Sequence, residues 1–471
     1  MDVKPSEIAH QLRANFPFEP TSDQDAALGS MAEFLCDDRK DVVYVLKGYA
    51  GTGKTTLVRS LTKTLPPLDF KTVLLSPTGR AAKVMASYSG ERAYTIHKAI
   101  YIPQRSPGGG MMFGLRPNRA SNTLFIVDEA SMISDATIEV SRNSLLEDLL
   151  MFVQMGSGNK LMLIGDTAQL PPVHYDTSPA LDPTVLGYYG KEVYLAELTE
   201  VMRQAAESGV LKNATQLRQL QVDVSSPKIE ETADVHRLYD GYMIEEALNN
   251  ANNEGLENVV VIVRSNKRAN MYNRQIRSRV HWREDRVATG DYLMVVRNNY
   301  FWLPSKSRAG FLANGDIVEV LELRNSMEIH GLSFVDATVR LPDFPDEEPF
   351  ETKLILDVLD YEGPSLSKEA HDQLFQGVWD DYADEPSRSK RMERVKNDPF
   401  FNALQVKFSY AVTGHKAQGG QWKHVFIEHP WLPEGEVDLE YLRWLYTAFT
   451  RSSEQVYLIG FPDDFFLHPP R

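Results

Sequence analysis

Short apolar runs alternate with helix-compatible stretches along the first 200 residues of the chain. The runs are rich in Leu or β-branched residues, and most are followed by Gly, Pro, Asp or Ser, as is typical of strands buried on both faces of a parallel sheet. They are Val42–Leu46, Thr72–Leu75, Leu124–Val127, Leu161–Ile164 and Val193–Leu195. Because parallel strands need crossover connections, which are usually helices, this pattern predicts a doubly wound α/β domain.

A second set of apolar runs lies later in the chain, at Val259–Val263, Val425–Ile427 and Val456–Ile459. About 160 residues separate the first of these runs from the second. This spacing predicts a second α/β domain that is interrupted by an insertion.

Two segments have the character of insertions. Tyr101–Ser121 contains the sequence SPGGG and few periodic apolar residues, which predicts a hairpin or loop that projects from the first domain. From about Gly290 the pattern alternates between apolar and polar positions, with turn signals such as Asn-Gly-Asp at 314–316, which predicts a small β-rich module. The acidic stretch Ser365–Lys396 follows it and is compatible with helix.

Composition narrows the class of protein. The chain has 471 residues, enough for roughly three domains. Its 42% hydrophobic and 24% charged residues exclude collagen-like, low-complexity and disulfide-rich classes. The single cysteine, Cys36, can form neither an internal disulfide nor a cysteine-based metal site on its own. No signal peptide and no apolar run of about 18 residues is present, so we expect a cytoplasmic protein without a membrane partner.

Charge is unevenly distributed along the chain. The formal net charge of −15 argues against a protein that coats nucleic acid by bulk attraction. However, residues 341–400 carry 16 acidic and 7 basic residues, whereas residues 264–286 carry 8 basic and 2 acidic ones. Both stretches are compatible with solvated surface, but the segregation leaves room for a local basic groove.

The sequence of Gly48–Thr55, GYAGTGKT, fits the phosphate-binding pattern GxxxxGK[ST]. It lies between the predicted strand Val42–Leu46 and the helix-compatible stretch Thr56–Thr64, which is the context that this pattern requires. Glycines let successive backbone N–H groups turn toward phosphate oxygens, and the helix N-terminus adds a favourable dipole. We expect Lys54 to reach the β- and γ-phosphates of a nucleotide and the Thr55 hydroxyl to ligate Mg²⁺.

Polar residues follow two of the other predicted strands. Leu124–Val127 is followed by Asp128, which could hold Mg²⁺ through its water shell, and by Glu129, which could act as general base for an attacking water. Gln169 lies in the segment GDTAQLPP (165–172) after the next strand. It could contact a γ-phosphate or position water, or be an ordinary turn residue.

Eight segments occur in an order that resembles a known set of motifs. They are GYAGTGKTT (48–56), LSPTGRAA (75–82), TIH (95–97), IVDEAS (126–131), GDTAQLPPV (165–173), LTEVMRQ (198–204), VTGHKAQGGQW (412–422) and LYTAFTRS (445–452). Together they resemble the motifs of superfamily 1B helicases, in the RecD-like and Dda-like branch. The resemblance extends from Gln24 to Arg451 and so covers nearly the whole chain.

The resemblance implies two RecA-like domains with doubly wound parallel sheets. The first domain, 1A, would comprise residues 1–205 and carry an inserted β-hairpin, 1B, at about 100–121. The second, 2A, would comprise residues 206–289 and 404–471. An inserted SH3-like β-rich domain with an acidic extension, 2B, would comprise residues 290–403.

The resemblance also implies a set of site residues. ATP would be bound by Gln24, which reads the adenine edge, and by Gly48, Ala50, Gly51, Thr52, Gly53, Lys54, Thr55 and Thr56. Thr55 and Asp128 would hold the metal. The catalytic set would be Lys54, Glu129, the γ-phosphate sensor Gln169, and Arg203 and Arg451, which stabilise charge on the transferring phosphoryl group. DNA would be contacted by Thr78, His97, Phe113, Thr413, His415 and Lys416, with Phe113 at the hairpin tip.

The function that the resemblance implies is ATP-dependent DNA unwinding, with translocation 5′ to 3′ on single-stranded DNA. ATP and Mg²⁺ would occupy the cleft between the two RecA-like domains, which would close on ATP and open after hydrolysis. Partners would be single-stranded DNA and forked duplex, together with replication or recombination proteins. The residues leave other readings open: a P-loop kinase or small-molecule ATPase, a non-enzymatic DNA-binding or scaffolding subunit, and an RNA-dependent motor.

Overall fold

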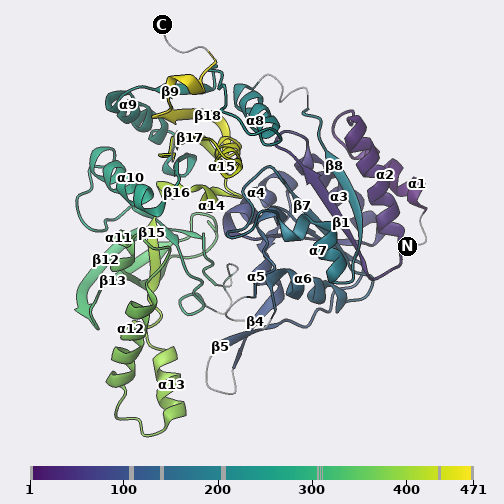
Figure 1. The fold of residues 1–471 in the computed structure, drawn as a ribbon. Coiled ribbons are helices and arrows are strands. Elements are labelled where there is room, and N and C mark those ends of the chain that lie inside the picture. Colours follow the sequence, from purple (N-terminus) through teal and green to yellow (C-terminus); the bar gives the residue numbers. More distant parts are fainter. Residues whose placement is uncertain are drawn as a thin grey trace.

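The computed structural model of the chain describes residues 4–105, 111–137, 143–202, 208–304, 307, 309, 311–432 and 436–467, with backbone alone for residues 103–105 and 111–113. Its strands form two parallel sheets, one closed barrel and one two-stranded ribbon (Figure 1). Two parallel-sheet α/β domains are the core of the predicted fold class, and this part of the prediction is confirmed.

The first sheet has six strands in the order β3-β2-β6-β7-β1-β8, all parallel. Strand β1 lies between β7 and β8, and its side chains at 42–46 are all buried. The strands are β1 (Val42–Gly48), β2 (Lys71–Ser76), β3 (Ala93–Thr95), β6 (Thr123–Val127), β7 (Lys160–Gly165) and β8 (Glu192–Leu198). The helices around this sheet are α1 (Pro5–Ala14), α2 (Ser22–Cys36), α3 (Lys54–Thr64), α4 (Gly79–Ser89), α5 (Ile96–Ile100), α6 (Leu145–Gln154) and α7 (Pro183–Tyr188).

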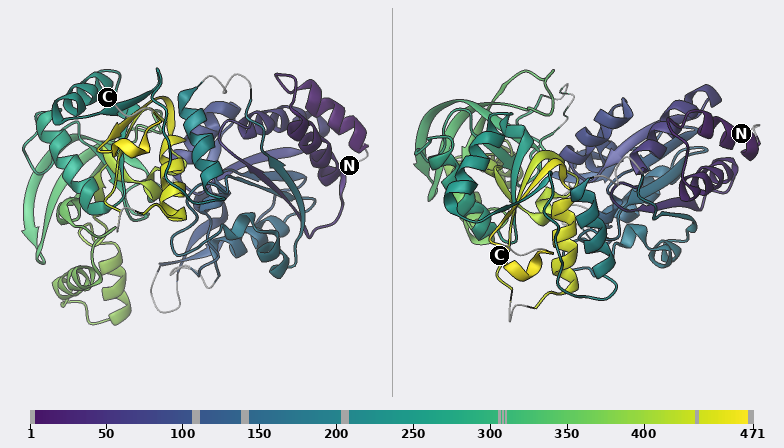
Figure 2. Two further views of the ribbon diagram at one scale, coloured as in Figure 1. Left: turned by 45° about the horizontal axis from the view of Figure 1, so that its top comes forward. Right: turned by 90° about the horizontal axis from the view of Figure 1, so that it is seen from above.

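The second sheet has five parallel strands in the order β16-β10-β17-β18-β9. They are β9 (Val235–Leu238), β10 (Val259–Val263), β16 (Ala411–Thr413), β17 (Trp422–Glu428) and β18 (Ser452–Ile459). The helices of this domain are α8 (Gly209–Leu220), α9 (Gly241–Asn252), α10 (Asn266–Arg279), α14 (Gly414–Ala417) and α15 (Leu439–Phe449). In both views of Figure 2, α8 and α15 lie side by side at the boundary between the two sheet domains.

The barrel joins strands β11 to β15 in chain order and closes by pairing β11 with β15. The strands are β11 (Tyr292–Val295), β12 (Ile317–Ile329), β13 (Leu332–Arg340), β14 (Phe350–Ile355) and β15 (Leu404–Phe408). Three helices lie between β14 and β15: α11 (Asp357–Asp360), α12 (Lys368–Asp381) and α13 (Arg388–Lys396). The expected domain boundary at residue 403 falls immediately before β15, which belongs to the barrel by its pairing.

The two-stranded ribbon lies within the segment for which a hairpin is predicted. Its strands β4 (Tyr101–Arg105) and β5 (Met111–Leu115) pair antiparallel, with Pro103 opposite Phe113. Among the described residues, no helix is both long and apolar enough to cross a membrane.

Candidate nucleotide and nucleic-acid site

The phosphate-binding loop joins β1 to α3. Gly53, the last residue before α3, has φ = +89°, and a Cβ at this position would collide with the side-chain amide of Gln24. Glycine at this position therefore permits both the left-handed backbone conformation and the close approach of Gln24 from α2. The Lys54 Nζ donates hydrogen bonds to the carbonyl oxygens of Gly48 (2.6 Å) and Tyr49 (2.9 Å), so the ammonium group lies against the loop. Gly48 is the last residue of β1, and the expected ATP-binding residues from 50 to 56 lie in the loop or in the first turn of α3.

Gln24 is buried between α2 and the phosphate-binding loop. Its Oε1 accepts a hydrogen bond from the Thr21 backbone N–H (3.0 Å), and its Nε2 donates to the Thr52 carbonyl (2.9 Å). Thr21 caps α2 in return, so the two residues form a capping box. Both ends of the amide thus make contacts within the protein, and Gln24 braces the loop. The adenine-reading role stays a prediction.

Asp128 and Glu129 follow β6. Asp128 accepts hydrogen bonds from the Glu129 N–H (2.8 Å) and from the Tyr88 hydroxyl (2.6 Å). Burial, together with the neighbouring Glu129, raises the pKa of Asp128 above its ordinary value. Glu129 itself has φ = +54°, a left-handed conformation that is uncommon for residues other than glycine. Such strained backbone concentrates at functional sites.

Asp166 follows β7, the strand next to β6, and so lies at the same edge of the sheet as Asp128. It accepts hydrogen bonds from the Ala168 N–H (2.9 Å) and from the Tyr446 hydroxyl (2.6 Å). Burial raises the pKa of Asp166, and Lys54 opposes this shift.

Gln169 lies in the loop after β7 and is only 6% exposed. Its Oε1 is buried and has no hydrogen-bond partner among the described residues. A buried amide oxygen without a partner is costly, so this atom fits a site that a polar ligand or water completes. The loop also contacts the second sheet domain, because the Leu170 N–H donates to the Thr447 hydroxyl (2.9 Å).

Arg451 follows α15 and reaches the first sheet domain. Its side chain is buried, and its Nη1 lies 3.3 Å from Oε1 of Glu129. Its Nε donates to the Thr447 carbonyl oxygen (3.1 Å), which ties the guanidinium group to the end of α15. The structure therefore brings Arg451 of the second sheet domain to Glu129 of the first. Lys54 and Glu129 also lie close enough to Asp128 to influence its pKa. Arg203 lies outside the described residues.

The donor atoms fit a nucleotide and Mg²⁺. Thr55 is exposed at the first turn of α3, and Asp128 follows β6 at the same edge of the sheet as this helix. Hydroxyl and carboxylate oxygens are the ligands that Mg²⁺ prefers, usually with several waters retained.

The expected DNA-facing residues of the first domain follow β2 and β3. Thr78 caps α4 by accepting a hydrogen bond from the Ala81 N–H (3.2 Å). His97 is half-buried in α5, and burial lowers its pKa to about 4, so its ring is uncharged at neutral pH. The prediction that Phe113 lies at the hairpin tip is wrong for its backbone, which pairs with Pro103 within the ribbon, two residues into β5. Its side chain lies outside the described part of the chain.

The expected DNA-facing residues of the second domain follow β16, where Thr413 precedes the short helix α14. His415 and Lys416 are half-buried in α14, and burial lowers the pKa of both. The two sets of residues adjoin: Gly419 packs against Thr78 and Ala81.

The barrel covers part of this surface. The Asp316 carboxylate lies against the N-terminus of α4, where a Cβ at Gly79 would collide with its Oδ1. Asp316 also lies 3.6 Å from the Lys98 Nζ, and Asp343 lies 2.5 Å from the Lys83 Nζ. A helix N-terminus and two lysines are typical anion-binding groups. A cavity of about 740 Å³ opens beside these contacts, lined by Arg80, Lys83, Arg340, Asp343 and Lys423 among others.

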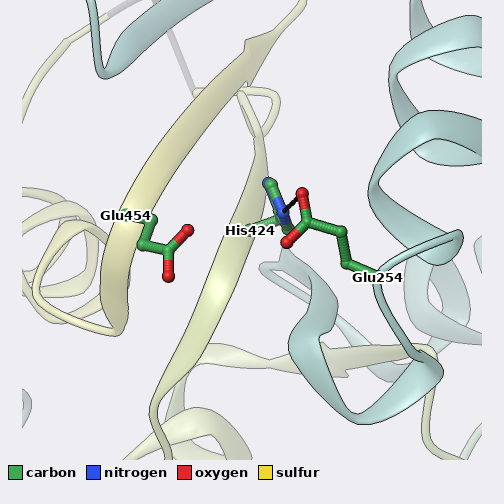
Figure 3. A group of neighbouring side chains, drawn as sticks. All are labelled: Glu254, His424 and Glu454. Atoms are coloured by element: carbon green, nitrogen blue, oxygen red, sulfur yellow. Dashed lines mark ion pairs between the residues drawn. The ribbon is translucent and has the colours of Figure 1, made fainter.

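Glu254, His424 and Glu454 form a cluster with the composition of a metal site (Figure 3). However, the Lys423 Nζ lies 3.5 Å from Glu254 and 3.3 Å from Glu454. The His424 Nε2 lies 3.3 Å from Glu254 and lowers the pKa of that carboxyl. Basic groups of the protein thus already pair with both carboxylates, and we assign no metal here.

Three site residues were not assigned from the sequence: Tyr88, Asp166 and Tyr446. The sequence does contain a pattern that indicates Asp166 as a site residue, because Asp166 follows a buried strand as Asp128 does. The two tyrosines carried none, since only the folded chain brings their hydroxyls to the carboxylates.

The chain has two parallel-sheet domains, with a loop of the phosphate-binding pattern in the first and an arginine of the second beside the Glu129 carboxylate. This is the architecture of a two-domain P-loop protein. Residues 22–241 match the family described as AAA domain, and residues 408–459 match the UvrD-like helicase C-terminal domain. These matches support the resemblance to helicases of superfamily 1B, in the RecD-like and Dda-like branch, that the motifs predict.

Two relatives match part of the chain. The ATP-dependent RecD2 DNA helicase of Deinococcus radiodurans is 34% identical over 174 residues, which is 36% of this chain and 21% of the relative. The ATP-dependent DNA helicase dda of Enterobacteria phage T4 is 29% identical over 176 residues, which is 37% of each chain. The matched part of the chain thus spans well under two thirds of either relative. A solved structure of Pif1 helicases at forked DNA matches 96% of this chain and 95% of its own, with 15% identity and a TM-score of 0.48.

Proposed function

We propose that the chain is an ATP-dependent DNA helicase that translocates 5′ to 3′ on single-stranded DNA and unwinds forked duplex. The contact between Arg451 and Glu129 across the two sheet domains is the observation that carries this proposal. It supports a nucleotide site that is complete only when the domains are closed. Hydrolysis can then be coupled to domain movement, as a translocating motor requires.

The proposed roles of the side chains follow from their positions. Lys54 and the N–H groups of the loop bind the phosphates. Glu129 takes the proton of the attacking water, which Gln169 orients through its unpaired Oε1. Arg451 stabilises the negative charge that develops on the γ-phosphoryl group. Bound Mg²⁺, held by Thr55 and Asp128, would neutralise charge on the phosphate oxygens.

Single-stranded DNA would lie along the surface that Thr78 and His97 share with Thr413 and Lys416. Hydroxyl groups, helix N-termini and a few cations suit contact with the phosphate backbone without sequence readout. Because Asp316 occupies the N-terminus of α4, the barrel must move before DNA can reach Thr78. The barrel and its helices would then be domain 2B, and the ribbon β4–β5 would be hairpin 1B.

The decisive experiment measures ATP hydrolysis with and without single-stranded DNA, and unwinding of duplexes with 5′ or 3′ tails. We expect strong stimulation by DNA and unwinding of forked or 5′-tailed duplexes alone. Lys54→Ala should abolish hydrolysis while leaving single-strand binding largely intact, since Lys54 lies in the nucleotide loop.

Other outcomes would contradict the proposal. Hydrolysis that is indifferent to DNA would favour a small-molecule ATPase. Stimulation by RNA alone would change the substrate, and unwinding of 3′-tailed duplexes would reverse the direction. DNA binding without hydrolysis would favour a non-enzymatic subunit.

A further inference from the structure

We propose that Tyr446 is a positioning residue whose hydroxyl fixes α15 against the phosphate-binding loop and thereby holds Arg451 at Glu129. This inference rests on the proposed function. It concerns a residue of the second sheet domain whose hydroxyl lies inside the nucleotide site of the first.

The hydroxyl of Tyr446 bridges two parts of that site. It accepts a hydrogen bond from the Ala50 N–H of the phosphate-binding loop, at 2.9 Å, across 396 residues of sequence. It donates to Oδ2 of Asp166 at 2.6 Å. Tyr446 and Asp166 are each only 1% exposed, so neither can exchange this contact for one with bulk water. A hydrogen bond between a buried hydroxyl and a carboxylate is stronger than a neutral one, and its loss leaves a buried acceptor unpaired.

Helix α15 transmits this contact to the arginine. Tyr446 lies in its last turn, and Arg451 follows two residues after the helix ends. The Arg451 Nε donates to the Thr447 carbonyl, so the guanidinium group is anchored to the residue next to Tyr446. The Thr447 hydroxyl in turn accepts the Leu170 N–H, which fixes the same turn against the loop after β7. A displacement of this turn would therefore move Arg451 relative to Glu129.

Tyr446→Phe tests the proposal, because it removes the hydroxyl and keeps the ring within the hydrophobic core. Tyr441→Phe is the matched control. Tyr441 lies on the same helix, is also 1% exposed, and its hydroxyl has no hydrogen-bond partner among the described residues. Both variants should melt within about 3 °C of the parent protein, which checks that the fold is retained.

The expected result is a split between the kinetic constants. Tyr446→Phe should lower kcat for DNA-stimulated ATP hydrolysis by about tenfold and change KM for ATP by less than about twofold, because Lys54 and the loop still bind the phosphates. Tyr441→Phe should change neither. In an Arg451→Ala background, Tyr446→Phe should cause no further loss of kcat, since it acts through that arginine.

Two results would overturn the inference while leaving the proposed function intact. One is a Tyr446→Phe variant with the kinetics of Tyr441→Phe. The other is a loss of kcat that adds fully to that of Arg451→Ala, which indicates a structural role. A parent protein that binds ATP but does not hydrolyse it with or without DNA would overturn both proposals.

Discussion

The Nη1 atom of Arg451 lies 3.3 Å from Oε1 of Glu129, although 322 residues separate them in the sequence. We predict that Arg451→Ala lowers kcat for ATP hydrolysis by at least about a hundredfold, because no other described cation from the second domain contacts Glu129. Steady-state hydrolysis at saturating DNA measures this. Binding of a fluorescent ATP analogue should change little, and an unchanged kcat would remove Arg451 from the site.

The contact of Asp343 with Lys83 predicts that the barrel competes with DNA for α4. Asp343→Asn should tighten binding of single-stranded DNA about threefold at low salt, with the difference shrinking as salt rises. Fluorescence anisotropy with a labelled oligonucleotide measures the affinity. Asp372→Asn, an exposed position on α12, makes the same change in net charge and should have little effect. Equal effects of the two variants would contradict a local competition.

The position of Gln24 predicts a general effect on nucleotide binding. Gln24→Ala removes the hydrogen bond to the Thr52 carbonyl that joins α2 to the phosphate-binding loop, together with the bond from the Thr21 N–H at the start of α2. It should therefore raise KM for ATP and for GTP by similar factors. It should also lower stability by about 1–2 kcal/mol through loss of the capping box. A rise in KM for ATP alone would instead support the adenine-reading role that the family resemblance implies.

The lowered pKa of His97 predicts a dependence of stability on pH. A histidine with a pKa of about 4 in the folded protein and about 6.5 when unfolded is protonated first in the unfolded chain as pH falls. Its contribution to stability is therefore intact above about pH 6.5 and is lost as pH falls toward 4. Between pH 7 and pH 5 this loss amounts to about 2 kcal/mol.

Thermal unfolding at these two pH values measures the effect. His97→Gln should reduce the difference in Tm between pH 7 and pH 5, whereas the exposed His10→Gln should leave it unchanged. Identical pH dependence in the parent and His97→Gln would show that His97 does not titrate in this way.

Local sequence signals predict much of the fold and the glycine-rich loop that follows β1. Strands such as 42–46 and 124–127 can be predicted because they are continuous apolar runs. The glycine-rich loop can be predicted because its phosphate-binding chemistry depends on residues that are neighbours in the sequence. Strands β3 and β16 are not predicted from the sequence, because a run of three residues is too short to show the alternation of a strand.

The remaining site contacts depend on tertiary structure. The hydroxyl of Tyr446 reaches Ala50 only because α15 lies against the first domain, and no spacing along the chain encodes that distance. Asp316 could not be placed for the same reason: its position against α4 depends on how the barrel docks. Burial of Asp128 and Asp166, which sets their pKa values, is equally a property of the assembled sheet.

The last turn of α15 and the residues just after it have a consequence for the reaction cycle. If this segment moves away from the first domain, three contacts are lost together. They are made by the hydroxyl of Tyr446, the hydroxyl of Thr447 and the guanidinium of Arg451. Release of spent nucleotide and loss of hydrolytic competence would then be a single event. A protein built in this way would not hydrolyse ATP while its two sheet domains are apart. It would therefore consume no ATP between translocation steps.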